Sequence, residues 1–193
     1  WQGTGSTGAV RSDGTLWTWG HNTKGQLGIG STSEQFNPVQ VGSLTDWDQI
    51  GGGQSCMCAI KTDGTLWGWG YTGQGVVPIG EGEVSYSSPV QVGSDTDWER
   101  LSMGPSHGLA GRTGGTLWSF GNGASGKLMQ GNSTNYSSPV QVGSATDWAN
   151  DVRSFAAAAT SSYAIKTTGA IWCAGNNGWG NLGQGNTTYY SSP

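Results

Sequence analysis

One short phrase recurs four times in this 193-residue chain, and this repetition constrains the fold more than any other feature. Gly-Thr-Leu-Trp ends at Trp17, Trp67 and Trp118, and an altered copy, Gly-Ala-Ile-Trp, ends at Trp172. These tryptophans are 50, 51 and 54 residues apart. Two further phrases, Pro-Val-Gln-Val-Gly-Ser and Thr-Asp-Trp, keep the same interval over three copies each. Self-similarity at a fixed period of this length predicts a repeat architecture.

The second copy of the repeat shows what each unit folds into. A short run ending at residues 51–53 and a small apolar run at 56–61 are followed by an Asp-Gly turn, a strong hairpin signal. The returning strand, residues 66–70, places Trp67 and Trp69 on one face and Leu66 on the other, because side chains alternate along a strand. A glycine-rich loop then leads to a fourth strand at 90–92. About four short antiparallel strands per unit predict a β-propeller blade.

The phrases divide the chain into units of approximately 1–47, 48–98, 99–148 and 149–193. The fourth unit has four extra residues between Trp148 and Trp172, which fall around an alanine run at 156–159. Inside a β repeat, we expect this run to be a bulge or an enlarged loop. Trp1 is expected to stand where a preceding Thr-Asp-Trp would end.

Composition and charge exclude several classes of protein. Eight Lys and Arg oppose twelve Asp and Glu, the pI is near 4.9, and the basic residues are scattered along the sequence. Nucleic-acid binding needs a concentrated basic surface, so none is expected. No apolar run approaches the roughly 20 residues of a membrane-spanning helix. Three cysteines cannot all pair, and Cys56 and Cys58 should point to the same face of one strand as small buried residues.

The phrases together resemble the regulator of chromosome condensation repeat. They are A-I-K-T-D-G-T-L-W-x-W-G at 59–70, N-x-x-G-Q-L-G-x-G at 22–30 and S-P-V-Q-V-G at 88–93. The resemblance covers essentially the whole chain and implies an all-β propeller, most often of seven blades. We therefore expect consecutive blades of a larger propeller, or copies that assemble to complete one. The family often has a His before the A-I-K strand, and only His107 fills that position here, which makes it a blade-packing residue rather than a catalytic one.

Catalysis requires a titratable group or a nucleophile placed against a partner, and no such pair is evident. Asp13 and Asp63 lie in hairpin turns, and the aspartates of Thr-Asp-Trp recur at the repeat period, as turn or capping residues do. Asp95 and Asp97 are too few for a calcium site. We expect no enzyme activity, no metal and no cofactor.

The variable loops between the repeated strands are the expected recognition elements, because propeller loops vary on a rigid framework. Trp179, Tyr189 and Tyr71 are the candidate binding residues in them. Three other tyrosines lie three residues before each proline and are interpreted as packing positions: Tyr86, Tyr136 and Tyr190.

These observations predict a non-enzymatic structural or binding module at an extracellular or virion surface, such as an adhesin, a tail fibre or a surface component. Its partner would be a protein or carbohydrate surface, or other copies of the chain. The alternative is a propeller that inhibits or binds a secreted enzyme. A GTPase exchange factor or a chromatin-binding protein is less favoured, because the acidic chain shows no basic surface.

Overall fold

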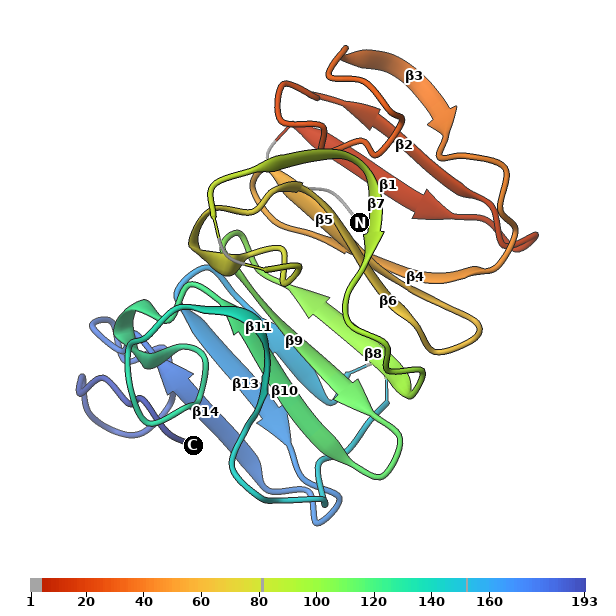
Figure 1. The fold of residues 1–193 in the computed structure, drawn as a ribbon. Helices are drawn as coiled ribbons and strands as arrows, with labels where there is room; N and C mark the ends of the chain where they lie inside the picture. The colour runs from red at the N-terminus through yellow and green to blue at the C-terminus, as the bar shows by residue number, and fades with distance from the viewer. Residues whose placement is uncertain (1–4, 81, 152) are drawn as a thin grey trace.

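The computed structural model describes residues 5–80, 82–151 and 153–193. Four antiparallel sheets follow one another along the chain as blades 1 to 4, running from the red end to the blue end of Figure 1. Blade 1 holds β1 (Ser6–Val10), β2 (Leu16–Gly20) and β3 (Gln35–Gln40); blade 2 holds β4 (Trp47–Gly52), β5 (Cys56–Lys61), β6 (Leu66–Tyr71) and β7 (Ser85–Gln91); blade 3 holds β8 (Trp98–Met103), β9 (His107–Arg112), β10 (Thr116–Gly121) and β11 (Tyr136–Gln141); blade 4 holds β12 (Phe155–Ala157), β13 (Ser161–Ile165) and β14 (Ile171–Gly175).

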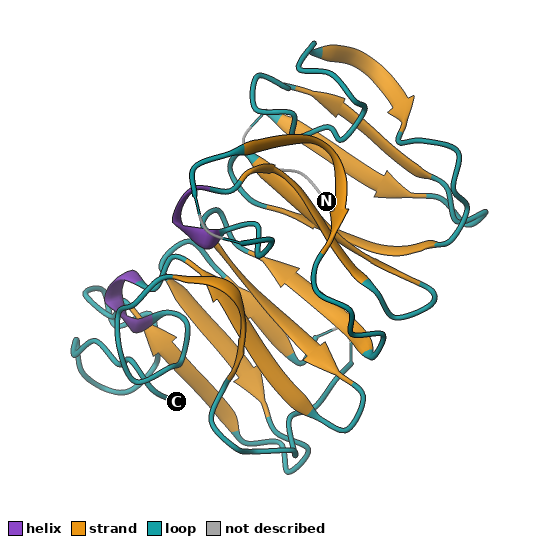
Figure 2. Cartoon of the chain, in the orientation of Figure 1, coloured by secondary structure: helices purple, strands orange, loops and turns teal. Residues whose placement is uncertain are grey.

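Within each blade the strands pair in sequence order, as in a meander. Only two short 3₁₀ turns interrupt the described β structure, η1 (Gly73–Gly75) and η2 (Ala124–Gly126), which are purple in Figure 2. The chain is therefore a partial β-propeller, as its repeats predicted. No helix among the described residues has the length and apolarity needed to span a membrane.

The Asp-Gly hairpins form where the sequence places them. In blade 2, the Asp63 carboxylate accepts hydrogen bonds from the Thr65 backbone N–H at 3.0 Å and from its hydroxyl at 2.6 Å. Gly64 has φ +77°, a conformation that a side chain would strain. These bonds lower the pKa of Asp63, because they stabilise its charged form. Asp63 is thus a turn residue, as predicted.

The core lies between neighbouring blades rather than within a single sheet. Trp67 and Trp69 pack toward blade 1, whereas Leu66 packs toward blade 3. Cys56 and Cys58 join the cluster that faces blade 3, so their predicted common face is confirmed. The sheets of blades 2 and 3 therefore bury one face against the blade before them and the other against the blade after them.

Blade 4 corrects the prediction for the alanine run. Residues 156 and 157 belong to β12, which pairs with β13 through Ala156 opposite Tyr163, so they are not an enlarged loop. The Ala157 N–H also donates to the Ser102 hydroxyl of blade 3 at 3.0 Å, which anchors the strand at the joint. The extra length lies before β12, while Trp148 keeps its place through a bridge to Lys166. The prediction made for Trp1 lies outside the described residues.

Candidate functional site

The longest loops of all four blades gather on one side of the molecule, which we call the loop face (Figures 1 and 2). They include residues 21–34, 72–80 with 82–84, 122–135 and 176–189. The opposite side carries the tight hairpins and the connections between blades, and we call it the hairpin face. The candidate recognition residues all belong to the loop face.

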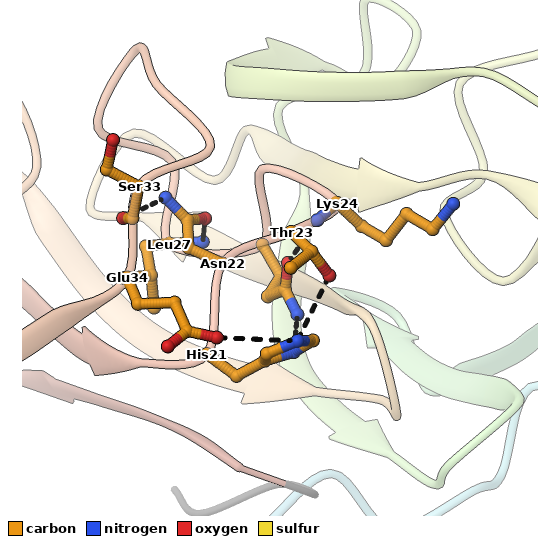
Figure 3. Close-up of polar contacts among 8 residues, drawn as sticks. His21, Asn22, Thr23, Lys24, Leu27, Ser33 and Glu34 are labelled. Carbon is orange, nitrogen blue, oxygen red and sulfur yellow. Dashed lines mark hydrogen bonds and ion pairs between the residues drawn. The ribbon is translucent and has the colours of Figure 1, made fainter.

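A buried polar side chain holds each of three loops in shape. In blade 1, the Asn22 amide donates to the Ser33 carbonyl at 2.8 Å, and its oxygen accepts the Leu27 N–H at 2.9 Å (Figure 3). The same amide also donates to the Ser31 carbonyl at 2.9 Å. Asn177 repeats this arrangement in blade 4, where its oxygen accepts the Leu182 N–H at 2.9 Å. In blade 2, the Thr72 hydroxyl takes this place and donates to the Gly82 carbonyl at 2.7 Å.

These anchoring residues were missed in the sequence, although a signal was present. An Asn stands five residues before a Leu-Gly pair in the first loop and again in the fourth. Buried amides that satisfy backbone groups fix a loop in one conformation. The loop face therefore consists of pre-formed loops on rigid blades.

His21, at the start of the first loop, has partners that the sequence did not reveal (Figure 3). Gln26 accepts the Lys24 backbone N–H at 2.8 Å, so its amide nitrogen faces His21 Nδ1, 2.9 Å away. Nδ1 thus accepts, and Nε2 carries the proton that it donates to the Thr23 hydroxyl at 3.0 Å. Glu34 lies 3.7 Å from the same Nε2.

This arrangement differs from a catalytic relay. In a relay, the hydroxyl and the carboxylate bind opposite nitrogens of the imidazole. Here both lie at Nε2, and Nδ1 is occupied by an amide. The contacts of His21 stabilise the loop instead.

The three predicted recognition residues lie in different surroundings. Trp179 is 96 % exposed and Tyr189 is 53 % exposed, both in the loop of blade 4. The Tyr189 hydroxyl accepts a hydrogen bond from the Asn176 amide at 2.9 Å, which orients its ring. Tyr71 is half-buried at the end of β6 in another blade, and the Lys24 ammonium lies 5.2 Å from its ring centroid. The structure thus places Trp179 and Tyr189 on one loop and Tyr71 at the joint between blades 1 and 2.

The other loop tyrosines make local contacts. Tyr86 packs against the core between blades 1 and 2. The hydroxyls of Tyr136 and Tyr190 accept hydrogen bonds from Asn132 at 3.0 Å and Asn186 at 2.9 Å.

On the hairpin face, a basic side chain lies against two tryptophans in each of three blades. We call these groups cation cages: Trp47, Lys61 and Trp67; Trp98, Arg112 and Trp118; Trp148, Lys166 and Trp172. The charged atoms lie between 4.1 and 5.5 Å from the ring centroids. The aspartate of each Thr-Asp-Trp pairs with the same cation, for example Asp46 with Lys61 at 3.2 Å.

The cages revise the interpretation of the basic residues as scattered. Arg11, Lys61, Arg112 and Lys166 occupy one position of the repeat, three residues before the glycine of the hairpin. Arg11 also lies over a tryptophan, Trp17, at 5.9 Å. Half of the basic residues are therefore part of the scaffold.

His107 is fully buried, and its Nε2 lies 2.8 Å from the Ser162 hydroxyl of blade 4. Burial, reinforced by the nearby Lys127 charge, lowers the pKa of His107 to about 3. It therefore stays neutral and packs between blades. Burial raises the pKa of Cys56 to about 12 and that of Cys58 well above its usual value. Among the described residues, no group of three or more metal-binding side chains gathers.

The repeats and the sheets together define part of a β-propeller. The sequence model of the regulator of chromosome condensation (RCC1) repeat matches residues 13–60, so the predicted resemblance is confirmed. No curated protein sequence matches the chain.

Solved structures of the same fold extend the comparison to the whole chain. Human WBSCR16 matches with a TM-score of 0.84 and 18 % identity over 100 % of this chain and 50 % of that one. Yeast RCC1 (Prp20), solved with Kap60 bound, matches with 0.83 and 18 % over 99 % and 46 %. Prp20p from Saccharomyces cerevisiae, described with its binding to Gsp1p and histones, matches with 0.82 and 18 % over 99 % and 48 %. The chain spans about half the length of these propellers.

Proposed function

We propose that this chain is a non-enzymatic protein-binding module in which the loop of blade 4 provides the main contact. The observation that carries the proposal is Trp179, which is 96 % exposed on a loop held by the buried Asn177. A tryptophan buries 150–250 Å² when a partner covers it, and tryptophan is enriched among residues that dominate binding energy. A pre-formed loop also loses little conformational entropy on binding.

A protein partner is supported by the fold as well as by this side chain. Yeast RCC1, which has the same fold, was solved with a protein, Kap60, bound to it. The likeness is one of fold, so it supports the class of partner and not its identity. The non-enzymatic role is supported by the geometry at His21 and by the burial of Cys56 and Cys58.

We place this module in an extracellular or virion assembly. Only 10 % of the residues are charged, and the loops are rich in Gly, Ser, Thr and Asn. A carbohydrate ligand is the main competitor, because exposed aromatics also stack on sugars. An inhibitor of a secreted enzyme would use the same loop.

The test selects ligands from a phage-displayed peptide library and from a glycan array, each probed with the folded chain. We expect peptides whose affinity falls at least ~30-fold in Trp179→Ser, the loss of a binding hot spot. Leu44→Ser is the matched control, because Leu44 is a 47 % exposed apolar residue in the connection between blades 1 and 2, on the hairpin face. Peptide binding that is equal in both variants, or binding to glycans alone, would refute the proposal.

A further inference from the structure

Lys127, in the loop of blade 3, is a buried lysine whose charge is not neutralised by a carboxylate. The residue is 5 % exposed, and its ammonium donates a hydrogen bond to the Ser106 hydroxyl at 2.8 Å. Among the described residues no carboxylate pairs with this ammonium, whereas each cation of the three cages pairs with the aspartate of its Thr-Asp-Trp. A lysine ammonium has three N–H donors, so two donors of Lys127 have no partner in the described part of the chain.

The groups beside this ammonium are uncharged. His107 follows Ser106, is fully buried, and has no hydrogen-bond partner for its Nδ1 among the described residues. Burial and, to a smaller extent, the Lys127 charge lower the pKa of His107 to about 3, so the imidazole is neutral and the ammonium lies near it. Burial also lowers the pKa of Lys127, since the charged form loses its hydration. A buried charge without a counter-charge destabilises the free protein, and groups with perturbed pKa values cluster at functional sites.

The backbone of the loop that carries Lys127 is strained on both sides of it. Ser125 has φ +62° and Met129 has φ +61°, a left-handed conformation that favours glycine. In blades 1 and 4 a glycine holds the position of Met129. Gly123 stands where the other three loops have their buried polar anchor. Strained backbone persists where function requires it, and ligand-binding segments are the common case.

The ammonium lies just below the loop face. Its partner Ser106 is half-buried in the turn between β8 and β9, and the carbonyl of Ser106 accepts the N–H of Asn122, the first residue of the blade 3 loop, at 2.9 Å. Pro105, on the other side of Ser106, is exposed. A carboxylate that contacts the Ser106 hydroxyl from outside therefore also comes within reach of the ammonium.

This position neighbours the blade that carries Trp179. The 3₁₀ turn η2 directly precedes Lys127 and packs against β14 of blade 4. A stable protein interface buries about 800 Å² on each partner, which is more than one loop presents. A partner that covers the blade 4 loop is thus expected to extend over the blade 3 loop as well.

We infer that the Lys127 ammonium and the Ser106 hydroxyl form a carboxylate-binding site, which takes an aspartate or glutamate side chain of the protein partner. This inference rests on the proposed function and adds the chemistry of its partner. One positive charge matches one carboxylate, and the remaining ammonium N–H groups and the hydroxyl donate to its two oxygens. The partner supplies the counter-charge that the cage cations receive from their own chain.

Lys127→Met tests the site, because methionine keeps an apolar stem of similar length and removes the charge. In the free chain, the melting temperature of this variant should equal or exceed that of the wild type, since an uncompensated buried charge is gone. Its affinity for peptides selected on the wild-type chain should fall at least ~10-fold. Arg153→Met is the control, because Arg153 is exposed in the connection between blades 3 and 4, on the hairpin face, and its loss should leave peptide binding unchanged.

The selected peptides provide the second half of a double-mutant cycle. They should share an acidic residue, and its replacement by the matching amide should weaken binding to the wild type at least ~10-fold and have no effect on binding to Lys127→Met. A loss of stability in Lys127→Met would show that the ammonium is structural and would overturn the inference. Unchanged peptide affinity in that variant would overturn it too.

Sodium acetate is a probe that does not depend on the peptides. In NMR spectra of the ¹⁵N-labelled chain, acetate should shift the Lys127 ammonium signal more than sodium chloride at equal ionic strength does. If peptides bind through Trp179 without an acidic residue and acetate has no such effect, the inference fails and the proposed function stands. If acetate shifts the signal but no peptide binds through Trp179, the proposed function fails and the carboxylate site stands.

Discussion

Lys61→Met removes the charge from the cation cage of blade 2 while keeping an apolar side chain of similar length. The ammonium lies 5.0 Å from the ring centroid of Trp47 and 4.6 Å from that of Trp67, and its side chain is 7 % exposed. Each cation–π contact contributes about 0.5 to 2 kcal/mol, and the ion pair with Asp46 about 0 to 1 kcal/mol. We expect the free energy of unfolding to fall by about 1 to 5 kcal/mol, the sum of these contributions.

Urea denaturation followed by tryptophan fluorescence and by circular dichroism measures this loss. Thermal unfolding should show a decrease of about 2 to 4 °C for each kcal/mol in a chain of this size. Lys61→Arg should retain most of the stability, because Arg112 fills the same cage in blade 3. Lys24→Met is the matched control, since Lys24 is exposed and contacts one ring only.

A different outcome is expected if Lys61 stabilises the cage through the volume of its side chain alone and its charge contributes nothing. In that case, Lys61→Met would be as stable as the wild type, because methionine fills the same volume. Equal losses in Lys61→Met and Lys24→Met would also contradict the account, since they would remove any special role of the second tryptophan and of Asp46.

Three further predictions follow from burial and backbone geometry. Burial holds the pKa of His107 near 3 in the folded state, whereas the pKa in the unfolded state is about 6.5. The stabilisation that comes from neutral His107 is therefore complete above pH 6.5 and is lost as the pH drops toward 3. In denaturation measured at several pH values, His107→Gln should lack this pH-dependent part of the stability. Gly64→Ala should cost at least ~2 kcal/mol more than Gly93→Ala, because both have positive φ but the new Cβ meets a backbone carbonyl only at Gly64; equal melting temperatures would contradict this. Cys56 and Cys58 should react with a thiol reagent only after unfolding, and rapid native labelling would show that they are accessible.

The strands and their faces could be predicted from the sequence because they depend on local patterns. The alternation in residues 66–70 and the Asp-Gly turn each act over a few residues, and the structure places Trp67, Trp69 and Leu66 on the expected faces. The cation cages could not be predicted this way. Trp47 and Lys61 are 14 residues apart in the sequence and meet because β4 and β5 pair at that position.

The residues of the candidate site could not be predicted from the repeated phrases, because the exposure and contacts of a side chain depend on the folded loop around it. Trp69 and Trp179 are the same residue type, yet one is fully buried in a joint and the other is 96 % exposed at a loop tip. Asn22 and Asn177 looked like ordinary loop residues, and their anchoring role appears only when the loop closes around them. Blade 4 shows the reverse case, where alanines with helical propensity form a strand because neighbouring strands pair with them.

Photo-crosslinking from position 179 tests the central claim most directly, because that claim makes Trp179 the residue that faces the partner. Trp179 is replaced by the photoreactive residue p-benzoylphenylalanine, the purified chain is irradiated with a peptide selected from the displayed library, and the crosslinked products are mapped by mass spectrometry. The account predicts a crosslink between position 179 and the bound peptide, and none when the photoreactive residue stands at position 44 on the hairpin face. Binding of the peptide without a crosslink from position 179, or an equal crosslink from position 44, would contradict it.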